Sequence, residues 1–156
     1  MLNAATTLKF LGRSGEAIPL FVQVSRVYSE HLDPLDYRFG GLFNNMALAY
    51  QDVGEYGTAE QYFLKADSIM RRCAGGDNEV AVTCCNLAEL YELMGREDKI
   101  EEMLDGAWLS LTQSGIRRDG YQAFTISKCL PTFEHFGFFV YEQALKKRLD
   151  EINERT

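Results

Sequence analysis

The 156-residue sequence contains no apolar run close to the roughly 18 residues that a membrane-spanning helix needs. It also lacks a basic leader followed by an apolar core and a small-residue cleavage site, so we expect no secretory signal. Its four cysteines, Cys73, Cys84, Cys85 and Cys129, do not have the spacing of a disulfide framework. These absences favour a reduced, cytoplasmic protein that does not enter a membrane.

Residues that carry catalytic or metal chemistry are also scarce. The only histidines are His31 and His135, and no third group is placed to orient a Cys129–His135 pair as a nucleophile. The cysteines do not provide the spaced ligands that zinc prefers, and the glycine-containing segments lack the Lys-Ser/Thr of a phosphate-binding loop. We therefore expect no enzyme activity, no metal and no cofactor.

The charge balance is acidic, with 16 Lys and Arg against 23 Asp and Glu and a formal net charge of −7. An acidic chain is repelled by phosphate backbones and by anionic lipid surfaces. We therefore expect neither nucleic acid nor a membrane as a partner. Hydrophobic residues make up 46% of the chain, which is enough for a continuous core.

The clearest feature that is present is a helical hairpin that repeats. In segment 44–66, apolar residues at helical spacing stop at Gly54 and resume on one face of a second helical run. The same pattern surrounds Gly12 and Gly95, which lie at nearly equal distances before and after Gly54 in the sequence. The matched neighbours include Tyr50 and Tyr91 and, after the glycines, Ala17, Phe21, Val24, Ala59, Phe63, Ala66, Ile100, Leu104 and Ala107. Because one hairpin cannot bury its own apolar face, three copies predict stacked hairpins.

These residues resemble the tetratricopeptide repeat, whose signature includes a Tyr, a Gly and then Ala, Phe and Ala at these separations. The spacing of about 42 residues exceeds the usual ~34 and is similar to the long-repeat variety of kinesin light chains and many bacterial proteins. The likeness is greatest in NNMALAYQDVGEY and NEVAVTCCNLAELYELMGR. It implies an all-α fold, a right-handed α–α superhelix of three hairpins with a degenerate fourth hairpin or capping helix.

We expect a single domain over residues 1–156, with repeats at about 1–32, 33–75 and 76–115 and a degenerate repeat or cap at 116–156. Helices are expected at 2–11, 15–31, 34–52, 56–73, 78–94, 97–113, 121–130 and 132–153. Asp33 is the expected N-cap of the third helix, and Pro131 should end the seventh. The segment is a degenerate fourth repeat if Gly137 is aligned with Ala59. The apolar run 138–141 is expected to be buried in the last hairpin, with docking of a partner or of a second copy of the chain as the alternative.

In tetratricopeptide proteins, the exposed face of the first helix of each hairpin lines a concave groove that takes peptides. The resemblance implies that the groove here is formed by Asn3, Asn44, Asn45, Leu48, Gln51, Asp52, Asn86, Glu89 and Glu92. Asn3, Asn45 and Asn86 hold the same place in three copies. Their amides either pair with the backbone of an extended peptide or bond to the neighbouring repeat and hold the stack together.

The charge of the predicted groove residues distinguishes between two classes of peptide ligand. When the equivalent places of all three copies are compared, only Lys9 in the first copy is basic, which argues against a clamp for a C-terminal carboxylate. The acidic residues favour a basic or mixed apolar peptide, unless they are simply a solvated face of an acidic protein.

The function expected from the sequence is a protein–protein interaction module, a scaffold or adaptor that binds a peptide or partner helix in its groove. The alternative is a self-associating structural or regulatory segment of a larger, bacterial-type multidomain protein, which includes a homodimer. This alternative is motivated by Met1, which falls inside a repeat, and by the aromatic C-terminal helix.

Overall fold

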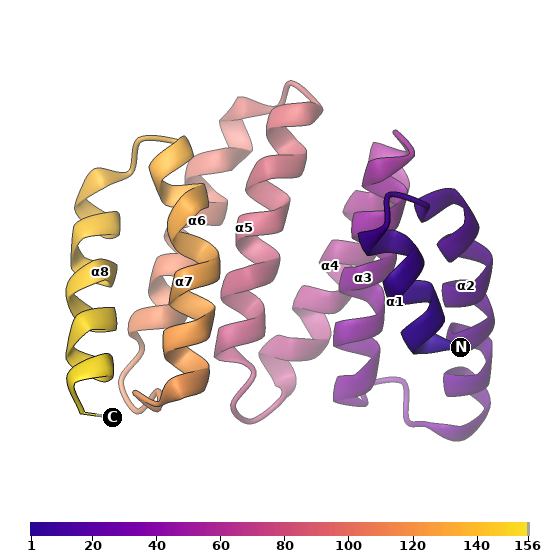
Figure 1. Ribbon diagram of the computed structural model, residues 1–156, viewed down its shortest axis with the longest axis horizontal. Coiled ribbons are helices and arrows are strands. Elements are labelled where there is room, and N and C mark those ends of the chain that lie inside the picture. Colours follow the sequence, from indigo (N-terminus) through magenta and orange to yellow (C-terminus); the bar gives the residue numbers. More distant parts are fainter. Residues whose placement is uncertain (156) are drawn as a thin grey trace. The chain divides into compact units, whose positions relative to one another are not determined.

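All regular structure in the described residues, 1–155 of this computed structural model, is helical (Figure 1). The helices are α1 (Leu2–Phe10), α2 (Ser14–His31), α3 (Tyr37–Asp52), α4 (Tyr56–Arg72), α5 (Asp77–Leu93), α6 (Ile100–Thr112), α7 (Gly120–His135) and α8 (Phe139–Glu154), with a short 3-10 turn, η1 (Glu97–Lys99), before α6. The all-α prediction is confirmed.

The chain divides into two compact units, unit 1 (Met1–Ala74) and unit 2 (Gly75–Thr156), each built from two helical hairpins. The expectation that both belong to one domain stays a prediction.

The same turn closes each of the four hairpins. Its glycine has a positive φ, between +71° and +83°, a conformation that side-chain-bearing residues rarely adopt. The residue after the glycine donates its backbone N–H to the carbonyl five residues earlier at 2.8–2.9 Å, which is the Schellman arrangement. The four glycines, which recur at nearly equal spacing along the chain, are Gly12, Gly54, Gly95 and Gly137.

The fourth hairpin follows this spacing, and the expected alignment of Gly137 with Ala59 is therefore wrong. Gly137 is a turn glycine, so Phe133 is the aromatic residue before the turn, and it is fully buried. Glu142 and Lys146 hold the places that are buried and apolar in the earlier hairpins, and the Lys146 Nζ donates to the Glu142 Oε1 at 2.5 Å. The hairpin is therefore regular in its turn and degenerate in its core.

The expected end of a helix at Pro131 is also wrong, because α7 continues through it to His135. Proline removes a helical hydrogen bond, at a cost of about 3 kcal/mol. Here Pro131 and Ser127, whose carbonyl loses that bond, are both exposed, so water can satisfy the carbonyl. The next two residues, Thr132 and Phe133, are buried, and their packing holds the chain on its helical path.

The apolar run at the start of α8 is only partly buried, so the expectation of burial is wrong for its two central residues. Phe139 is 62% exposed and Val140 is 83% exposed, whereas Phe138 and Tyr141 are half-buried. The reason is helical phase, since Glu142 and Leu145 occupy the inward face of α8. Among residues 1–155, no helix combines the length and the apolar character needed to cross a membrane.

Within each unit, the core follows the repeat. Large and small side chains alternate across the helix pairs, which lets the helices approach closely. The repeat-matched residues that are buried are Ala17, Phe21, Val24, Ala59, Phe63, Ala66, Tyr91, Ile100, Leu104 and Ala107. Tyr50 is half-buried, and its ring stacks on that of Tyr62 with centroids 5.5 Å apart.

Candidate functional site

The predicted binding residues of unit 1 lie on α1 and α3 and differ in exposure. Asn3 and Asp52 are exposed, and the remaining four, Asn44, Asn45, Leu48 and Gln51, are half-buried. The Oε1 atom of Gln51 is buried and accepts no hydrogen bond from the described residues. That these residues bind a peptide stays a prediction.

Asp52 has a role inside unit 1. Ser14 is only 3% exposed, and a buried hydroxyl needs a hydrogen-bond partner. Its Oγ donates to the Asp52 Oδ2 at 2.6 Å, which ties the start of α2 to the end of α3. This carboxylate therefore joins two hairpins, whatever else it contacts.

In unit 2, the acidic residues of the predicted groove contact the next hairpin. The Glu89 Oε1 accepts a hydrogen bond from the Thr132 Oγ1 at 2.8 Å. The two carboxylate oxygens of Glu92 lie 2.9 and 3.0 Å from the His135 Nε2. Both carboxylates thus lie along the line where α5 packs against α7, which gives them a structural role.

Two further pairs complete this polar contact between α5 and α7. The Tyr121 hydroxyl donates to Glu79, and burial together with this bond raises the pKa of Tyr121. Hydrogen bonding with Cys129 and burial raise the pKa of the Cys85 thiol. A buried thiol with a raised pKa is a poor nucleophile, and His135 is bound to Glu92.

Asn86 is half-buried on α5 and already interacts with other residues of the chain. When the turn glycines are aligned, its place in the fourth hairpin holds Lys128. The series formed by Asn3, Asn45 and Asn86 therefore has no fourth member. The Lys128 Nζ lies 5.7 Å from the centroid of the Phe124 ring, which is 61% exposed.

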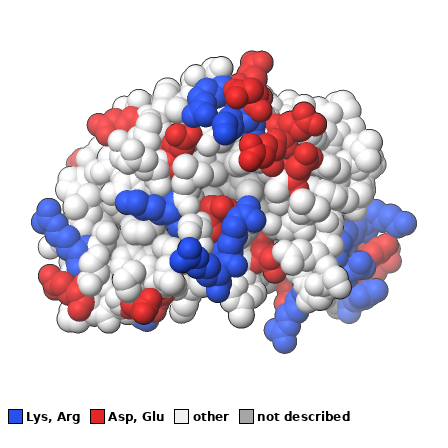
Figure 2. Space-filling model, turned by 180° about the vertical axis from the view of Figure 1, so that it is seen from behind, with Lys and Arg blue, Asp and Glu red and all other residues white. Residues whose placement is uncertain are grey.

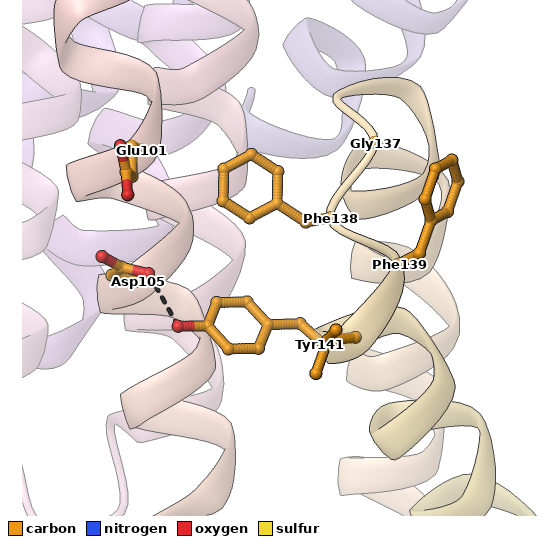
Figure 3. A pocket seen from close by; sticks show the side chains of 7 residues that line it. Glu101, Asp105, Gly137, Phe138, Phe139 and Tyr141 are labelled. Atoms are coloured by element: carbon orange, nitrogen blue, oxygen red, sulfur yellow. Dashed lines mark hydrogen bonds between the residues drawn. The ribbon is translucent and has the colours of Figure 1, made fainter.

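Sequence reasoning missed a second feature, a cavity of about 280 Å³ in unit 2 between α6 and the start of α8 (Figure 3). Glu101 and Asp105 face it from α6, and Phe138 and Tyr141 point toward them from the other side. The Tyr141 hydroxyl donates to the Asp105 Oδ1 at 2.8 Å, and this bond raises the pKa of Tyr141. The sequence contains both parts of the cavity, an aromatic run at 138–141 and acidic residues at the start of α6. Only the fold brings these two segments together.

The surface charge is mixed. On the face shown in Figure 2, groups of acidic side chains alternate with basic ones, and no continuous basic surface of the kind that holds a phosphate backbone is visible there. Within residues 1–155, no group of three or more His, Cys, Asp or Glu is arranged to hold a metal ion.

Comparisons with known proteins agree with this architecture. Residues 40–105 match the family model of the tetratricopeptide repeat. No curated protein matches the chain. Among solved structures, the chain is similar to BtubC (BKLC) from P. vanneervenii, with a TM-score of 0.67 and 19% identity over 97% of this chain and 61% of that one. It is also similar to the nearly identical TPR-like repeats of a putative kinesin light chain from Podosopora anserina, with a TM-score of 0.62 and 17% identity over 97% of this chain and 72% of that one.

The chain thus spans about three fifths of the length of BtubC. Because the identities are only 19% and 17%, these structural likenesses show the fold alone. The family match covers the central hairpins, and the fold likeness extends over nearly all of the chain. The predicted resemblance is thus confirmed: residues 40–105 match the tetratricopeptide-repeat family model, and the fold of nearly all of the chain is similar to that of kinesin-light-chain-type repeat structures.

Proposed function

We propose that this chain is a protein–protein interaction module that binds a peptide or a partner helix along the exposed face of its first helices. Tetratricopeptide repeats are in general scaffolds for protein interactions and typically carry no catalysis. The observation that supports the proposal is the exposure of large apolar side chains on this face. In unit 2, Leu93 on α5 is 51% exposed and Phe124 on α7 is 61% exposed; in unit 1, Phe10 on α1 is 76% exposed. Large apolar side chains, aromatic ones above all, can anchor a partner when it buries them.

The chemistry of this face in unit 2 favours a basic or mixed apolar peptide. Phe124 offers an aromatic anchor, and Asn86 offers an amide that can bond to an extended backbone. Glu89 and Glu92 are bound to α7, but both remain exposed and keep their negative charge facing solvent. They would attract a cationic residue of the peptide and raise its association rate.

The proposal is tested by selecting peptides from a displayed library on the full chain and measuring their affinity by fluorescence anisotropy. We expect Phe124→Ala to weaken binding about tenfold or more, as for an aromatic anchor, and Asn86→Ala to weaken it less. Leu109→Ala is the control, because Leu109 is similarly exposed, at 65%, but lies on α6 and outside both proposed binding sites. If both test variants keep their melting temperature and bind as the unmodified chain does, this face is not the binding site.

Self-association is the second candidate function. It is supported by the adjacent exposed residues Phe139 and Val140 at the start of α8, because exposed apolar pairs are used in contacts between copies. Sedimentation over a range of concentrations tests it. A monomer at the highest concentration would eliminate the candidate, and a dimer lost in Val140→Asp would support it.

A further inference from the structure

The cavity between α6 and α8 of unit 2 has two chemically different walls (Figure 3). Glu101 and Asp105 lie one helical turn apart on α6, so their carboxylates are on the same side of that helix. Phe138 and Tyr141 provide the opposite wall, with ring centroids 6.1 Å apart and planes tilted by 31°. A group that fits between these walls must be apolar or flat on one side and positively charged on the other.

The carboxylates of this cavity are not neutralised by any cation of the described residues. Neither Glu101 nor Asp105 forms an ion pair with a lysine or arginine in residues 1–155. Asp105 accepts one hydrogen bond through Oδ1, from Tyr141, and its Oδ2 remains available. Two uncompensated negative charges beside an aromatic wall attract a cation more strongly than the same charges do in open water.

The aromatic wall is held in place from behind. The ring of Trp108 stacks on that of Tyr141, with centroids 4.6 Å apart and planes 4° from parallel. Phe133, which is fully buried, contacts the same ring edge-on at 6.0 Å. Since the Tyr141 hydroxyl is also fixed by Asp105, its ring has a set orientation before any ligand arrives.

We propose that this cavity binds an arginine side chain of a partner protein. A guanidinium is planar, so it can stack on the faces of Phe138 or Tyr141 while its N–H groups point toward the two carboxylates. A lysine ammonium has the charge but not the flat surface or the forked donors. The cavity, at about 280 Å³, lies just below the range of sites that enclose whole small molecules, which suits a single side chain.

This site is separate from the face proposed above for peptide binding. That face lies on the first helix of each hairpin, which in unit 2 means α5 and α7, whereas the cavity is lined by α6, the turn at Gly137 and the start of α8. Loss of one site would therefore leave the other available to bind, and the two proposals fail independently.

Trp108 is the only tryptophan in the sequence, and its stacking on Tyr141 makes its fluorescence a reporter for the cavity. The probes are the blocked tripeptide acetyl-Gly-Arg-Gly-amide and two analogues, one with lysine and one with citrulline, which has the shape of arginine without its charge. We expect the arginine peptide to change the fluorescence saturably, the lysine peptide to bind more weakly, and the citrulline peptide to have no saturable effect.

Two matched variants test whether the arginine peptide binds in the cavity. Glu101→Gln removes one carboxylate of the cavity, and we expect it to weaken the arginine peptide about threefold to tenfold. Glu102→Gln removes the same charge from the next residue of α6, which does not line the cavity, and is expected to leave the affinity unchanged. Both residues are exposed, so neither change should impair folding, and equal melting temperatures verify this.

Three results would overturn the proposal. The first is the absence of a saturable response to the arginine peptide. The second is equal weakening by Glu101→Gln and Glu102→Gln, which would indicate general attraction to an acidic helix. The third is equal binding of the lysine or citrulline peptide. Phe124→Ala is expected to leave this titration unchanged, so a negative result here does not bear on the peptide face of α5 and α7.

Discussion

The two units join their hairpins by different chemistry, although the same repeat builds both. In unit 1, one polar pair, Ser14–Asp52, joins α2 to α3, and the junction is otherwise aromatic: Tyr28 meets Phe39 edge-on with centroids 5.7 Å apart. In unit 2, α5 packs against α7 through polar pairs, among them Glu89–Thr132 and Glu92–His135. The repeat pattern therefore specifies each hairpin but leaves open how consecutive hairpins are joined.

The difference has an energetic consequence. Burial of an aromatic ring stabilises a junction by several kcal/mol, whereas a net hydrogen bond contributes about 1 kcal/mol and an exposed ion pair less. We therefore expect the unit 1 junction to be sensitive to loss of volume and the unit 2 junction to be sensitive to loss of single polar partners.

The largest effect is expected from Phe39→Ala in unit 1. Phe39 is 4% exposed and contacts Tyr28, so its removal leaves a cavity and should lower the free energy of unfolding by about 3–5 kcal/mol. Urea denaturation followed by far-UV circular dichroism measures this change. Tyr37→Ala is the control on the same helix, because Tyr37 is 64% exposed, and it should cost less than about 0.5 kcal/mol. Equal costs for the two variants would contradict the aromatic character of this junction.

A pair of glycines tests how tightly unit 1 is packed. A Cβ atom added at Gly40 would lie 2.2 Å from the Sδ atom of Met70, which is itself buried, so Met70 must move. We expect Gly40→Ala to destabilise the protein by about 1–3 kcal/mol. The same change at the neighbouring Gly41 meets no atom and should stabilise it by about 0.5–1 kcal/mol through helix propensity. If Gly40→Ala raises the melting temperature as Gly41→Ala does, the close approach of α3 and α4 is not a constraint.

A smaller effect is expected from Thr132→Val in unit 2. This change keeps the shape of a residue that is 4% exposed and removes its hydrogen bond to Glu89 between α5 and α7. The expected cost is about 0.5–1.5 kcal/mol, since Glu89 can be solvated in compensation. Thr125→Val is the control on the same helix, because its hydroxyl bonds only to the carbonyl of Tyr121 within α7, and it should be nearly neutral. Equal costs in urea denaturation would show that the bond to Glu89 does not hold α5 to α7.

The parts of the fold that the sequence predicted are those set by local pattern. The turn glycines and the apolar spacing around them gave the first three hairpins, whose helices lie within a few residues of the expected ranges. The same signal extends to Gly137, one repeat length after Gly95, but Glu142 and Lys146 at places that are otherwise apolar concealed the register of the fourth hairpin.

The candidate sites were harder to predict, because they depend on residues far apart in sequence. The contacts of Glu89 and Glu92 join residues 43 positions apart, and they can be found only when the register of the fourth hairpin is known. The cavity beside Tyr141 needs α6 and α8 to lie at a particular separation, which no local pattern encodes. Helical phase could have predicted the exposure of Phe139 and Val140 once Gly137 was placed correctly.

The helix caps provide the last comparison between the units. The cap of α3 in unit 1 is Asp36 rather than the expected Asp33, whose carboxylate accepts instead from the Leu35 N–H at 2.8 Å in the preceding turn. The cap of α7 in unit 2 is Asp119, which accepts from the Gln122 N–H at 3.0 Å. Asp36 has an additional partner, because it accepts from the Arg38 side chain as well as from its backbone N–H.

The hydrogen bonds from the Arg38 side chain, followed by that from its backbone N–H, lower the pKa of Asp36 to about 2. A carboxylate whose pKa is depressed on folding stabilises the fold above its unfolded pKa and loses that contribution as the pH falls through its folded pKa. The contribution of Asp36 should therefore be complete above about pH 4 and be lost toward pH 2. Carbon-13 NMR titration of the side-chain carboxyl measures the midpoint, and Arg38→Gln should raise it. A midpoint that Arg38→Gln leaves unchanged would mean that the backbone cap alone lowers the pKa of Asp36.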